Sequence, residues 1–339
     1  MKNPKKVEYP SVTVVMITYN DEKIIEKCFQ SIKKQEYLGK VNILIVDGGS
    51  FDGSLRIAKK YKVLIISKPQ YRDMPYKRVE IAMSSVKTDI ALLFSADNRF
   101  KETDCLSKMV EPFSDKEISA VETFRFGYRN IDSILTKYFA LIGGTDPIAI
   151  SLDKADRAPY DILKWHSYGK VEEKSQYFKV TFSNDESKIP TLGANGFAVR
   201  NNIIKKFPFK DGLHIETCVN LIKKGYDKFA FVKDVHIIHD IEISLIEFLK
   251  RKLRWKQMYS NTNIKRAYLI YNPKRDKLKL FLIIFTNITL IVPLLRAIKG
   301  FIKKRELAWF LHPIMCNIFT ISYGVSVFER VFQRKNKDS

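Results

Sequence analysis

The sequence predicts an α/β fold, in which a mixed, mainly parallel sheet carries helices on both faces. Two observations over residues 11–100 predict this class. Strand-like and helix-like segments alternate along the chain, and the strand-like runs are apolar throughout instead of at every second position. Strands that are buried on both faces have this continuous apolar pattern, which is typical of parallel strands covered by helices.

Four strand-like runs and three helix-like segments make up this alternation. The predicted strands lie in SVTVVMITYN, VNILIVDGGS, YKVLIIS and DIALLFSADN. The predicted helices between them are DEKIIEKCFQSIKKQ, FDGSLRIAKKY and KRVEIAMSSVK, in which apolar residues recur at helical spacing. Residues 120–190 are less regular, and we expect a lid or an insertion that shapes a binding site there.

The chain after residue 190 gives three further predictions. The segment IPTLGANGFAVRNNII places two glycines around Asn195 before a strand-like run. HIETCVNLIKKGY predicts a helix that ends close to Gly225, because glycine is common just after the last residue of a helix. SLIEFLKRKLRWKQMY predicts a helix that is rich in positive charge.

The net charge of +22 is concentrated at the end of the chain. Residues 250–339 hold 20 Lys and Arg against 4 Asp and Glu, a net charge of +16. Such an excess attracts nucleic acid or an anionic membrane surface. The basic residues alternate with long aliphatic runs, and no nucleic-acid-binding motif is present. We therefore expect a membrane as partner and no nucleic acid.

The cysteines and the amino terminus indicate a reducing compartment. The four cysteines are widely scattered and form no C-x-x-C pair, which excludes a zinc knuckle and argues against a disulfide framework. The terminus MKNPKKVEYP lacks the apolar core of a signal peptide. We expect the part of the chain that carries the chemistry to lie in the cytoplasm.

Two apolar runs occupy the carboxyl-terminal region. Leu280 to Leu295 spans 16 residues without a charge and contains Pro293, and Leu307 to Phe328 spans 22 residues without a charge. A helix needs about 20 apolar residues to cross a bilayer core. Basic residues lie between the runs and also beyond both, which fits one span plus a surface helix, or two helices that dip in and return, better than a simple hairpin.

Polar clusters end three of the predicted strands. They are Thr18-Tyr19-Asn20, Asp47-Gly48-Gly49-Ser50 and Ser95-Ala96-Asp97-Asn98. Ligands of open parallel sheets bind beyond the carboxyl ends of the strands. Tyr19 offers a ring for a nucleotide base, Asp47 a carboxylate for polar groups, and Asp97 a hard oxygen ligand for Mg²⁺ or Mn²⁺. Taken by itself, Asp97 is equally a turn residue or a helix cap.

The segments VVMITYNDEKIIEKCFQSI, ILIVDGGSFDGS and ALLFSADN, in this order, resemble the nucleotide-binding half of glycosyltransferase family 2, which has the Rossmann-like GT-A fold. The resemblance covers roughly residues 11–260. It implies that Thr18, Tyr19 and the adjoining Asn20 bind the nucleotide. It also implies that Asp47 recognises base or ribose, and that Arg78 lies near the diphosphate.

The same resemblance assigns Asp97 to the last acid of the D-x-D motif, which ligates the metal. Ser95 stands where the first acid of that motif is usual, and Ala96 lies between the two. A hydroxyl orients a water or a ribose oxygen but adds no negative charge, so the dependence on Mg²⁺ or Mn²⁺ is open. His239 matches a family position that approaches metal or pyrophosphate.

The Glu-Asp motif that supplies the family's catalytic base is absent. The helix that ends near Gly225 begins DGLHIETCVN, so the candidates for the base are Glu216 first, then His214 and Asp211. The alternative for Glu216 is that it only favours the positive end of the helix.

The basic helix carries a second motif-like segment. RKLRW resembles the Q-x-x-R-W motif of processive members of the family, with arginine in place of glutamine. By this resemblance Arg254 binds the diphosphate and Trp255 forms a wall for the acceptor, because a planar guanidinium suits phosphate. By analogy, the loop around Asn195 lines the junction between sugar and acceptor.

The resemblance implies the following organisation and function. Residues 1–240 form the catalytic domain, with a nucleotide-binding half over about 11–120 and an acceptor half over 121–240; residues 241–275 form a basic amphipathic segment, and 276–339 form membrane-associated helices. The expected activity is transfer of a sugar, with inversion, from a UDP or GDP type of donor to a saccharide or lipid-linked acceptor at the cytoplasmic membrane face. The alternatives are a polyprenyl-phosphate sugar synthase, and an inactive membrane-bound binding module on the same fold.

Overall fold

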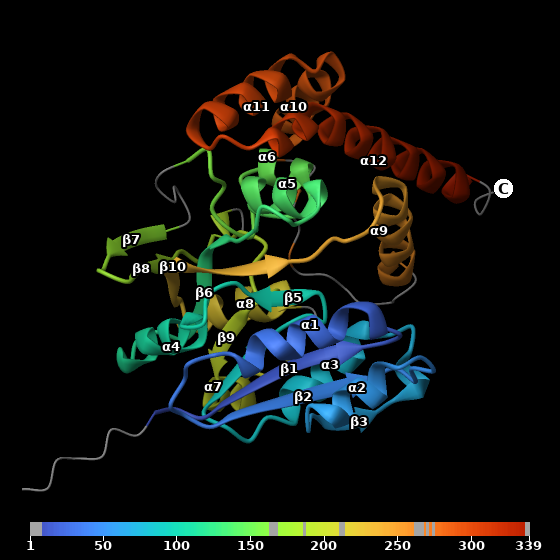
Figure 1. Ribbon diagram of the computed structural model, residues 1–339. Coiled ribbons are helices and arrows are strands. Elements are labelled where there is room, and N and C mark those ends of the chain that lie inside the picture. Colours follow the sequence, from blue (N-terminus) through green and yellow to red (C-terminus); the bar gives the residue numbers. More distant parts are fainter. Residues whose placement is uncertain are drawn as a thin grey trace, which may run out of the picture.

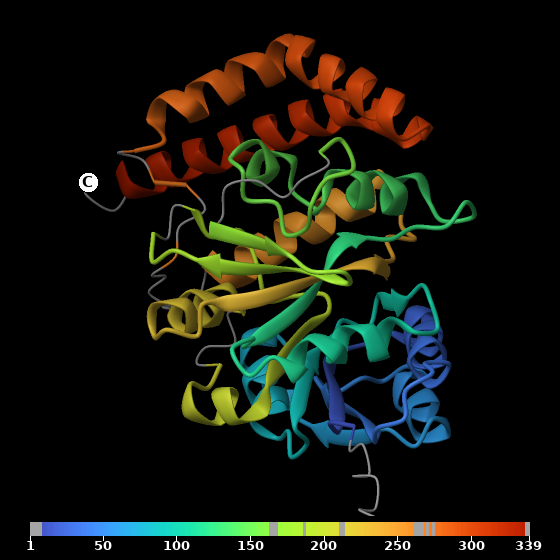
Figure 2. The same cartoon turned by 90° about the vertical axis from the view of Figure 1, so that its left-hand side faces the viewer.

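The computed structural model describes most of the chain in three stacked layers (Figures 1 and 2). An amino-terminal α/β layer lies at one end, further strands of the same sheet lie in the middle, and carboxyl-terminal helices cover the other end. The described residues are 9–162, 169–185, 188–209, 214–260, 268, 271–272 and 275–335, with the backbone alone for 254–260 and 326–335.

Four parallel strands form the amino-terminal half of the sheet, in the order β3-β2-β1-β4. They are β1 (Val12–Thr18), β2 (Val41–Asp47), β3 (Leu64–Ser67) and β4 (Ile90–Leu93). All four predicted strands are confirmed. The register pairs Thr18 with Asp47, so the ends of β1 and β2 lie at one edge.

Helices cover both faces of this sheet, as predicted. On one face lie α1 (Glu22–Lys33), α2 (Ser54–Lys60) and α4 (Cys105–Val110), and on the other lie α3 (Pro75–Ser84), α7 (Asn201–Lys206) and α8 (His214–Lys223). The two faces have separate cores. Phe29 packs with Val14 on the first face, and Met83 packs with Val15 on the second. Alternate side chains of β1 therefore enter opposite cores.

The second half of the sheet is mixed, with strand order β9-β6-β10-β8-β7 after β4, and β5 pairs with β10. The strands are β5 (Asn98–Phe100), β6 (Ala120–Phe126), β7 (Gly169–Glu173), β8 (Tyr177–Phe182), β9 (Phe197–Arg200) and β10 (Lys228–His239). Residues 120–190 are thus more regular than expected, because β6 lies inside the sheet. Glu122 and Thr123 interrupt its apolar pattern, yet both are buried.

Helices from the middle and the end of the chain form the layer at the far end (Figure 2). They are α5 (Ile134–Ile142), α6 (Pro147–Ser151), α10 (Lys277–Thr289), α11 (Ile291–Lys303) and α12 (His312–Lys335). Helix α9 (Leu245–Ser260) stands beside the middle strands, between this layer and the amino-terminal layer (Figure 1). Phe139, Phe248, Trp309 and Phe319 share one core there. Leu290, with φ of 61°, separates α10 from α11.

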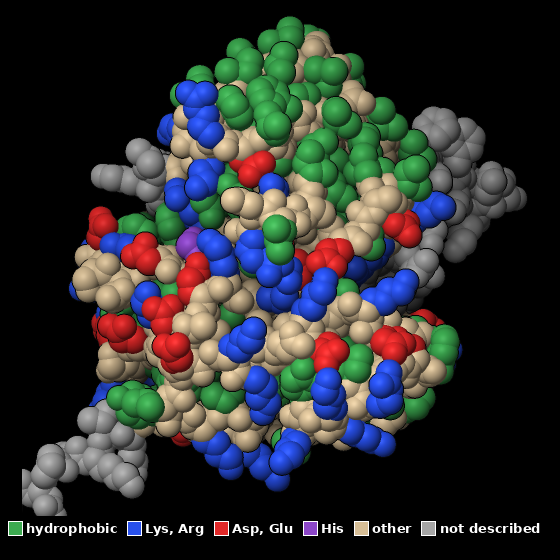
Figure 3. Space-filling view, in the orientation of Figure 1, with side chains coloured by type: hydrophobic (Ala, Val, Ile, Leu, Met, Phe, Trp, Pro, Cys, Tyr) green, Lys and Arg blue, Asp and Glu red, His purple; other side chains and the backbone are tan. Residues whose placement is uncertain are grey.

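Many apolar side chains of α10 and α11 face outward. Phe281, Phe285, Ile291 and Leu295 are each more than half exposed, and apolar side chains cover the end of the molecule at these helices (Figure 3). Within the described part of the chain, no single helix has the length and hydropathy needed to cross a membrane. Helices α10 and α11 meet those criteria only when taken together, and they bend by 78° at their junction.

Candidate active site

The carboxyl ends of β1, β2 and β4 gather the predicted nucleotide-binding residues at one edge of the sheet. The Tyr19 ring follows β1, with the guanidinium carbon of Arg72 5.0 Å from its centroid and the Phe51 ring 6.3 Å away. The Tyr19 ring thus forms one side of this sheet edge, and the guanidinium of Arg72 lies over it. Asn20, at φ of 55°, accepts a hydrogen bond from Phe51 N at 3.0 Å through its Oδ1.

Thr18, Asp47 and Arg78 hold the loops of this edge together. Asp47 is fully buried, and its carboxylate accepts hydrogen bonds from Gly49 N at 2.8 Å and from the Ser50 hydroxyl at 2.5 Å. Arg78 donates to Thr18 O at 2.6 Å. These contacts shape the turn after β2 and fix it to β1, and recognition of a base or ribose by Asp47 stays a prediction.

Asp97 follows β4 and is contacted by two side chains from the far half of the chain. Arg251 Nη2 of α9 lies 3.2 Å from Asp97 Oδ2, and His239 Nε2 at the end of β10 lies 3.4 Å from the same oxygen. Asp97 is 6% exposed. Burial by itself raises the pKa of Asp97, but His239 and Arg251 outweigh it and lower that pKa to about 2, so the carboxylate is ionised at neutral pH.

The unpaired atoms around Asp97 fit a single divalent cation that also binds a ligand. Asp97 Oδ1 and His239 Nδ1 are buried and have no hydrogen-bond partner among the described residues. The same part of the chain contains no group of three His, Cys, Asp or Glu residues that could hold a metal. Mg²⁺ is commonly bound by one or two carboxylates together with substrate phosphates. Asp97 and His239 could therefore hold a divalent cation only if a bound ligand supplied the remaining oxygen atoms.

The loop after residue 192 reaches the same edge. Asn195 Oδ1 accepts hydrogen bonds from the Ser95 hydroxyl at 3.1 Å and from Asn98 Nδ2 at 3.3 Å. Asn195 has φ of 52°, a left-handed conformation that asparagine tolerates better than most residues. Ser95 therefore anchors this loop beside Asp97, whereas the side chain of Ala96 is buried.

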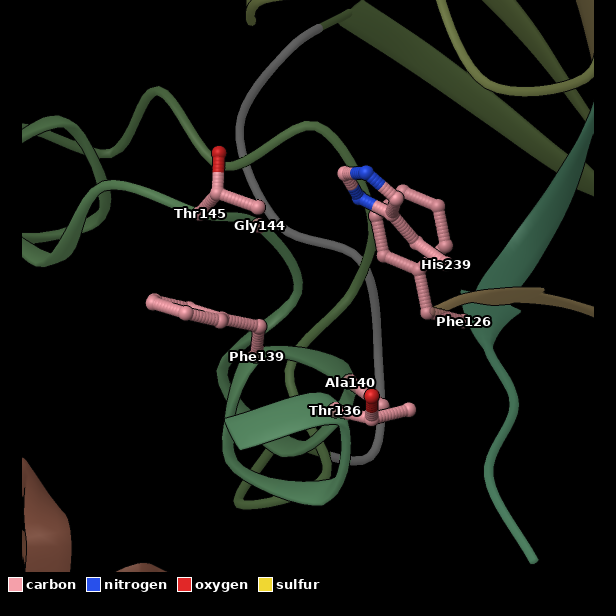
Figure 4. Close-up of a pocket in the computed structure, with 7 residues that line it drawn as sticks. All are labelled: Phe126, Thr136, Phe139, Ala140, Gly144, Thr145 and His239. Carbon is pink, nitrogen blue, oxygen red and sulfur yellow. The ribbon is translucent and has the colours of Figure 1, made fainter. Parts of the chain in front are cut away.

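A small pocket opens next to His239 (Figure 4). Its lining residues come from the ends of β6 and β10, from α5 and from the loop that follows it; they are Phe126, Thr136, Phe139, Ala140, Gly144, Thr145 and His239. The pocket therefore lies between α5 and the ends of β6 and β10.

Residues 13–190 match the family model described as Glycosyl transferase family 2. The chain belongs to this family. A relative described as N-acetylglucosaminyltransferase, from Bradyrhizobium elkanii, is 28% identical over 122 residues, which cover 34% of this chain and 65% of that protein. The chain therefore matches less than two thirds of that relative's length.

Two solved structures resemble this chain to different degrees. The mannosyltransferase PcManGT from Pyrobaculum calidifontis, in complex with GDP-Man and Mn²⁺, has a TM-score of 0.53 at 14% identity, over 94% of this chain and 87% of that chain. S. aureus TarS 1–349, in complex with UDP, has a TM-score of 0.48 at 12% identity, over 93% and 92% of the two chains. The likeness to the mannosyltransferase confirms the predicted GT-A fold.

The predicted bases of this family 2 protein lie at the start of α8. Glu216 accepts hydrogen bonds from Tyr268 N with both carboxylate oxygens, at 3.0 and 3.1 Å. His214 is the first residue of the helix. Asp211 lies outside the described residues, as do the side chains of Arg254 and Trp255. The catalytic role given to Glu216, His214 or Asp211 stays a prediction, as do the binding roles given to Arg254 and Trp255.

Sequence reasoning missed two residues at this edge. Asp21 accepts a hydrogen bond from the Thr18 hydroxyl at 2.8 Å; burial raises the pKa of Asp21, and the nearby Asp97 carboxylate raises it further. Arg251 was noted only as the arginine that replaces glutamine in RKLRW; no role was assigned to it, and it lies 154 residues from Asp97. The position of Asp21 directly after Thr18-Tyr19-Asn20 was a signal that could have identified it.

Proposed function

We propose that this protein is a glycosyltransferase that moves a sugar from a nucleotide-diphosphate sugar to a saccharide or lipid-linked glycan acceptor, with inversion at the sugar carbon. The observation that carries the proposal is the buried, ionised Asp97, which has one unpaired oxygen and stands at the same sheet edge as the Tyr19 ring. A diphosphate donor needs such a pair, because its base stacks on a ring and its phosphates need cations.

Each group at the edge has a role in this reaction. Tyr19 would stack against the base, and Asp97 with His239 would hold Mg²⁺ or Mn²⁺. When bound, the metal neutralises charge on the diphosphate as it leaves. Arg251 faces the same position and attracts the phosphates directly, since a guanidinium matches phosphate oxygens. The curated relative, an N-acetylglucosaminyltransferase, supports a nucleotide-sugar donor.

Transfer of labelled sugar tests the proposed function. The purified protein is incubated with UDP-N-acetylglucosamine or GDP-mannose, with Mn²⁺, and with either lipid-linked saccharides or a polyprenyl phosphate. We expect label in one lipid fraction together with release of nucleoside diphosphate. If no nucleotide sugar gives transfer of label or release of nucleoside diphosphate, the result would favour an inactive binding module.

A polyprenyl-phosphate sugar synthase is the second candidate, and Lys252 favours it. Lys252 Nζ donates to the Thr145 hydroxyl at 3.0 Å, lies 5.7 Å from the Phe248 ring centroid, and has no carboxylate within 4.0 Å among the described residues. Burial lowers the pKa of Lys252. A partly buried lysine that makes no ion pair among the described residues suits a phosphate, and Thr145 lines the pocket beside His239. The two acceptors in the assay above separate the candidates.

We further propose that α10 and α11 rest on the cytoplasmic face of a membrane. Their outward side chains form a large apolar surface, and exposed lysines and arginines such as Lys299, Lys304 and Arg305 border it. An apolar helical face with basic residues at its rim is typical of helices that lie in the membrane interface. The acceptor pocket below these helices would then open near the lipid surface.

Charged substitutions on this face are expected to weaken membrane binding. The double variant Phe285→Glu/Ile291→Glu buries two charges in the lipid, so binding to vesicles of phosphatidylcholine and phosphatidylserine should fall by at least about tenfold in flotation. Leu38→Glu, at a more exposed apolar residue in the loop before β2, is the control and should bind as wild type. Equal binding by all three proteins would contradict the proposed membrane contact.

A further inference from the structure

A buried charge cluster next to the donor edge has no part in the assignments above. Arg157 is fully buried, and its Nη1 donates to Glu122 Oε2 at 2.6 Å and to Asp156 Oδ1 at 2.7 Å. Its Nη2 donates to Asn195 O at 3.3 Å. One guanidinium therefore holds two carboxylates and, at the same time, the loop that contacts Ser95.

The two carboxylates of the cluster differ in whether their second oxygen accepts a hydrogen bond. Glu122 is fully buried, and its second oxygen accepts from Gly193 N at 2.9 Å. The side chain of Asp156 is 12% exposed, and no hydrogen bond to its Oδ2 exists among the described residues. Asp156 is thus the carboxylate of this pair that keeps an oxygen available to a substrate.

Asp156 lies next to the pocket beside His239. A Cβ atom at Gly144 would lie 3.7 Å from Asp156 N and 3.9 Å from Asp156 Cβ, which are ordinary contact distances, so Gly144 packs against Asp156. Gly144 and His239 line the same pocket (Figure 4), and His239 contacts Asp97. Gly144 therefore connects Asp156 to the pocket that His239 lines.

The cluster also packs against the first turn of α8. A Cβ atom at Gly193 would lie 2.9 Å from His214 O and 2.7 Å from Cys218 Sγ, and Gly193 donates to Glu122. The first turn of α8 is where Glu216 was expected to act as base, but Glu216 contacts Tyr268 N with both oxygens. The loop after α6 thus brings another carboxylate to the same part of the site.

The geometry points to Asp156 as the catalytic base that deprotonates the acceptor hydroxyl. This assignment rests on the proposed transferase function. As the acceptor oxygen forms its bond to the anomeric carbon, its proton passes to Asp156 Oδ2 and the bond from that carbon to the diphosphate breaks. The nucleoside diphosphate carries away the electron pair, and Asp156 later returns the proton to water.

Arg157 acts as a positioning residue in this scheme, because it fixes Oδ1 and leaves Oδ2 to the substrate. The surroundings also favour a proton acceptor. Burial raises the pKa of Asp156, while Arg157 and the more distant His239 lower it in part. Burial likewise raises the pKa of Glu122. A carboxylate with a raised pKa is a stronger base than an exposed one, yet it can still be ionised at neutral pH.

Asp156→Asn tests this assignment, with Asp153→Asn and Glu216→Gln as comparisons. The probe is the nucleotide sugar that wild type uses, UDP-N-acetylglucosamine or GDP-mannose, with water as acceptor if no other is known. We expect turnover of Asp156→Asn at saturating donor to fall about 10²- to 10⁴-fold, with donor binding changed less than threefold. Asp153 is exposed and paired with Lys279, so Asp153→Asn should turn over as wild type.

The outcomes separate this inference from the proposed function. If wild type transfers and Asp156→Asn turns over within threefold of it, or loses donor binding in parallel, Asp156 is not the base. A loss confined to Glu216→Gln would also overturn the assignment. Should Asp156→Asn not fold, Asp156→Glu replaces it: turnover lowered at least tenfold with normal donor binding supports the base, and wild-type turnover refutes it. Failure of wild type itself to act on any donor refutes the proposed function instead.

Discussion

Replacing Asp97 with alanine is expected to lower sugar transfer at least about a thousandfold. The substitution removes the only carboxylate that reaches both His239 and Arg251 among the described residues. It removes the anion that faces Arg251 and, on the proposed function, the oxygen that would hold Mg²⁺ or Mn²⁺ against the diphosphate. Losing a preorganised electrostatic group of this kind typically costs two or more orders of magnitude in turnover, and loss of the metal adds to it. Steady-state transfer with saturating donor measures the effect.

Ser95→Ala and Asp97→Asn are the controls for this prediction. Ser95 contributes a hydrogen bond to Asn195 and no charge, so its loss should reduce transfer less than about tenfold. Asp97→Asn keeps the shape of the buried side chain and should fold, yet it should be nearly as inactive as Asp97→Ala. Near-wild-type transfer by either Asp97 variant would remove Asp97 from the site.

Replacing Arg157 with methionine is expected to lower the free energy of unfolding by about 3–5 kcal/mol. The variant leaves Glu122 and Asp156 buried with no cation, and removing one partner of a buried ion pair is far more costly than removing both. A loss of this size corresponds to a fall of roughly 5–15 °C in the midpoint of thermal unfolding.

Lys27→Met is the matched control, because its ion pair has the same length but lies on the surface. Lys27 Nζ is 2.7 Å from Glu242, with both side chains at least 40% exposed, whereas the 2.6 Å pair of Arg157 and Glu122 is fully buried. Exposed pairs contribute about 0–1 kcal/mol. Equal midpoints for the two variants would show that burial does not decide the contribution of the Arg157 cluster.

The sequence was sufficient for the features that depend on local pattern. The continuous apolar runs around Val14, Ile45 and Leu92 predicted parallel strands, and the structure confirms them. Because parallel strands end at a common edge, the same reasoning brought Tyr19 and Asp97 to one side of the sheet. Gly225, with φ of 84°, ends α8 as its position predicted.

The sequence was not sufficient where burial depends on a distant partner. Glu122 makes β6 resemble an exposed segment, and only Arg157, 35 residues later, shows why its charge can be buried inside the sheet. Arg251 reaches Asp97 across 154 residues, and Asn195 reaches Ser95 across 100. The periodicity of apolar residues carries no information about such distant pairs, so these contacts could be found only in the structure.

The most direct test of whether this sheet edge is a donor site is the binding of a nucleoside diphosphate. Binding to wild type and to Asp97→Ala is measured with and without Mn²⁺. UDP and GDP are titrated by calorimetry. We predict that Mn²⁺ tightens binding of one of them at least about tenfold in wild type, a coupling of about 1.4 kcal/mol, and has no such effect in Asp97→Ala. The same Mn²⁺ effect in both proteins, or binding of neither nucleotide to wild type, would contradict the account.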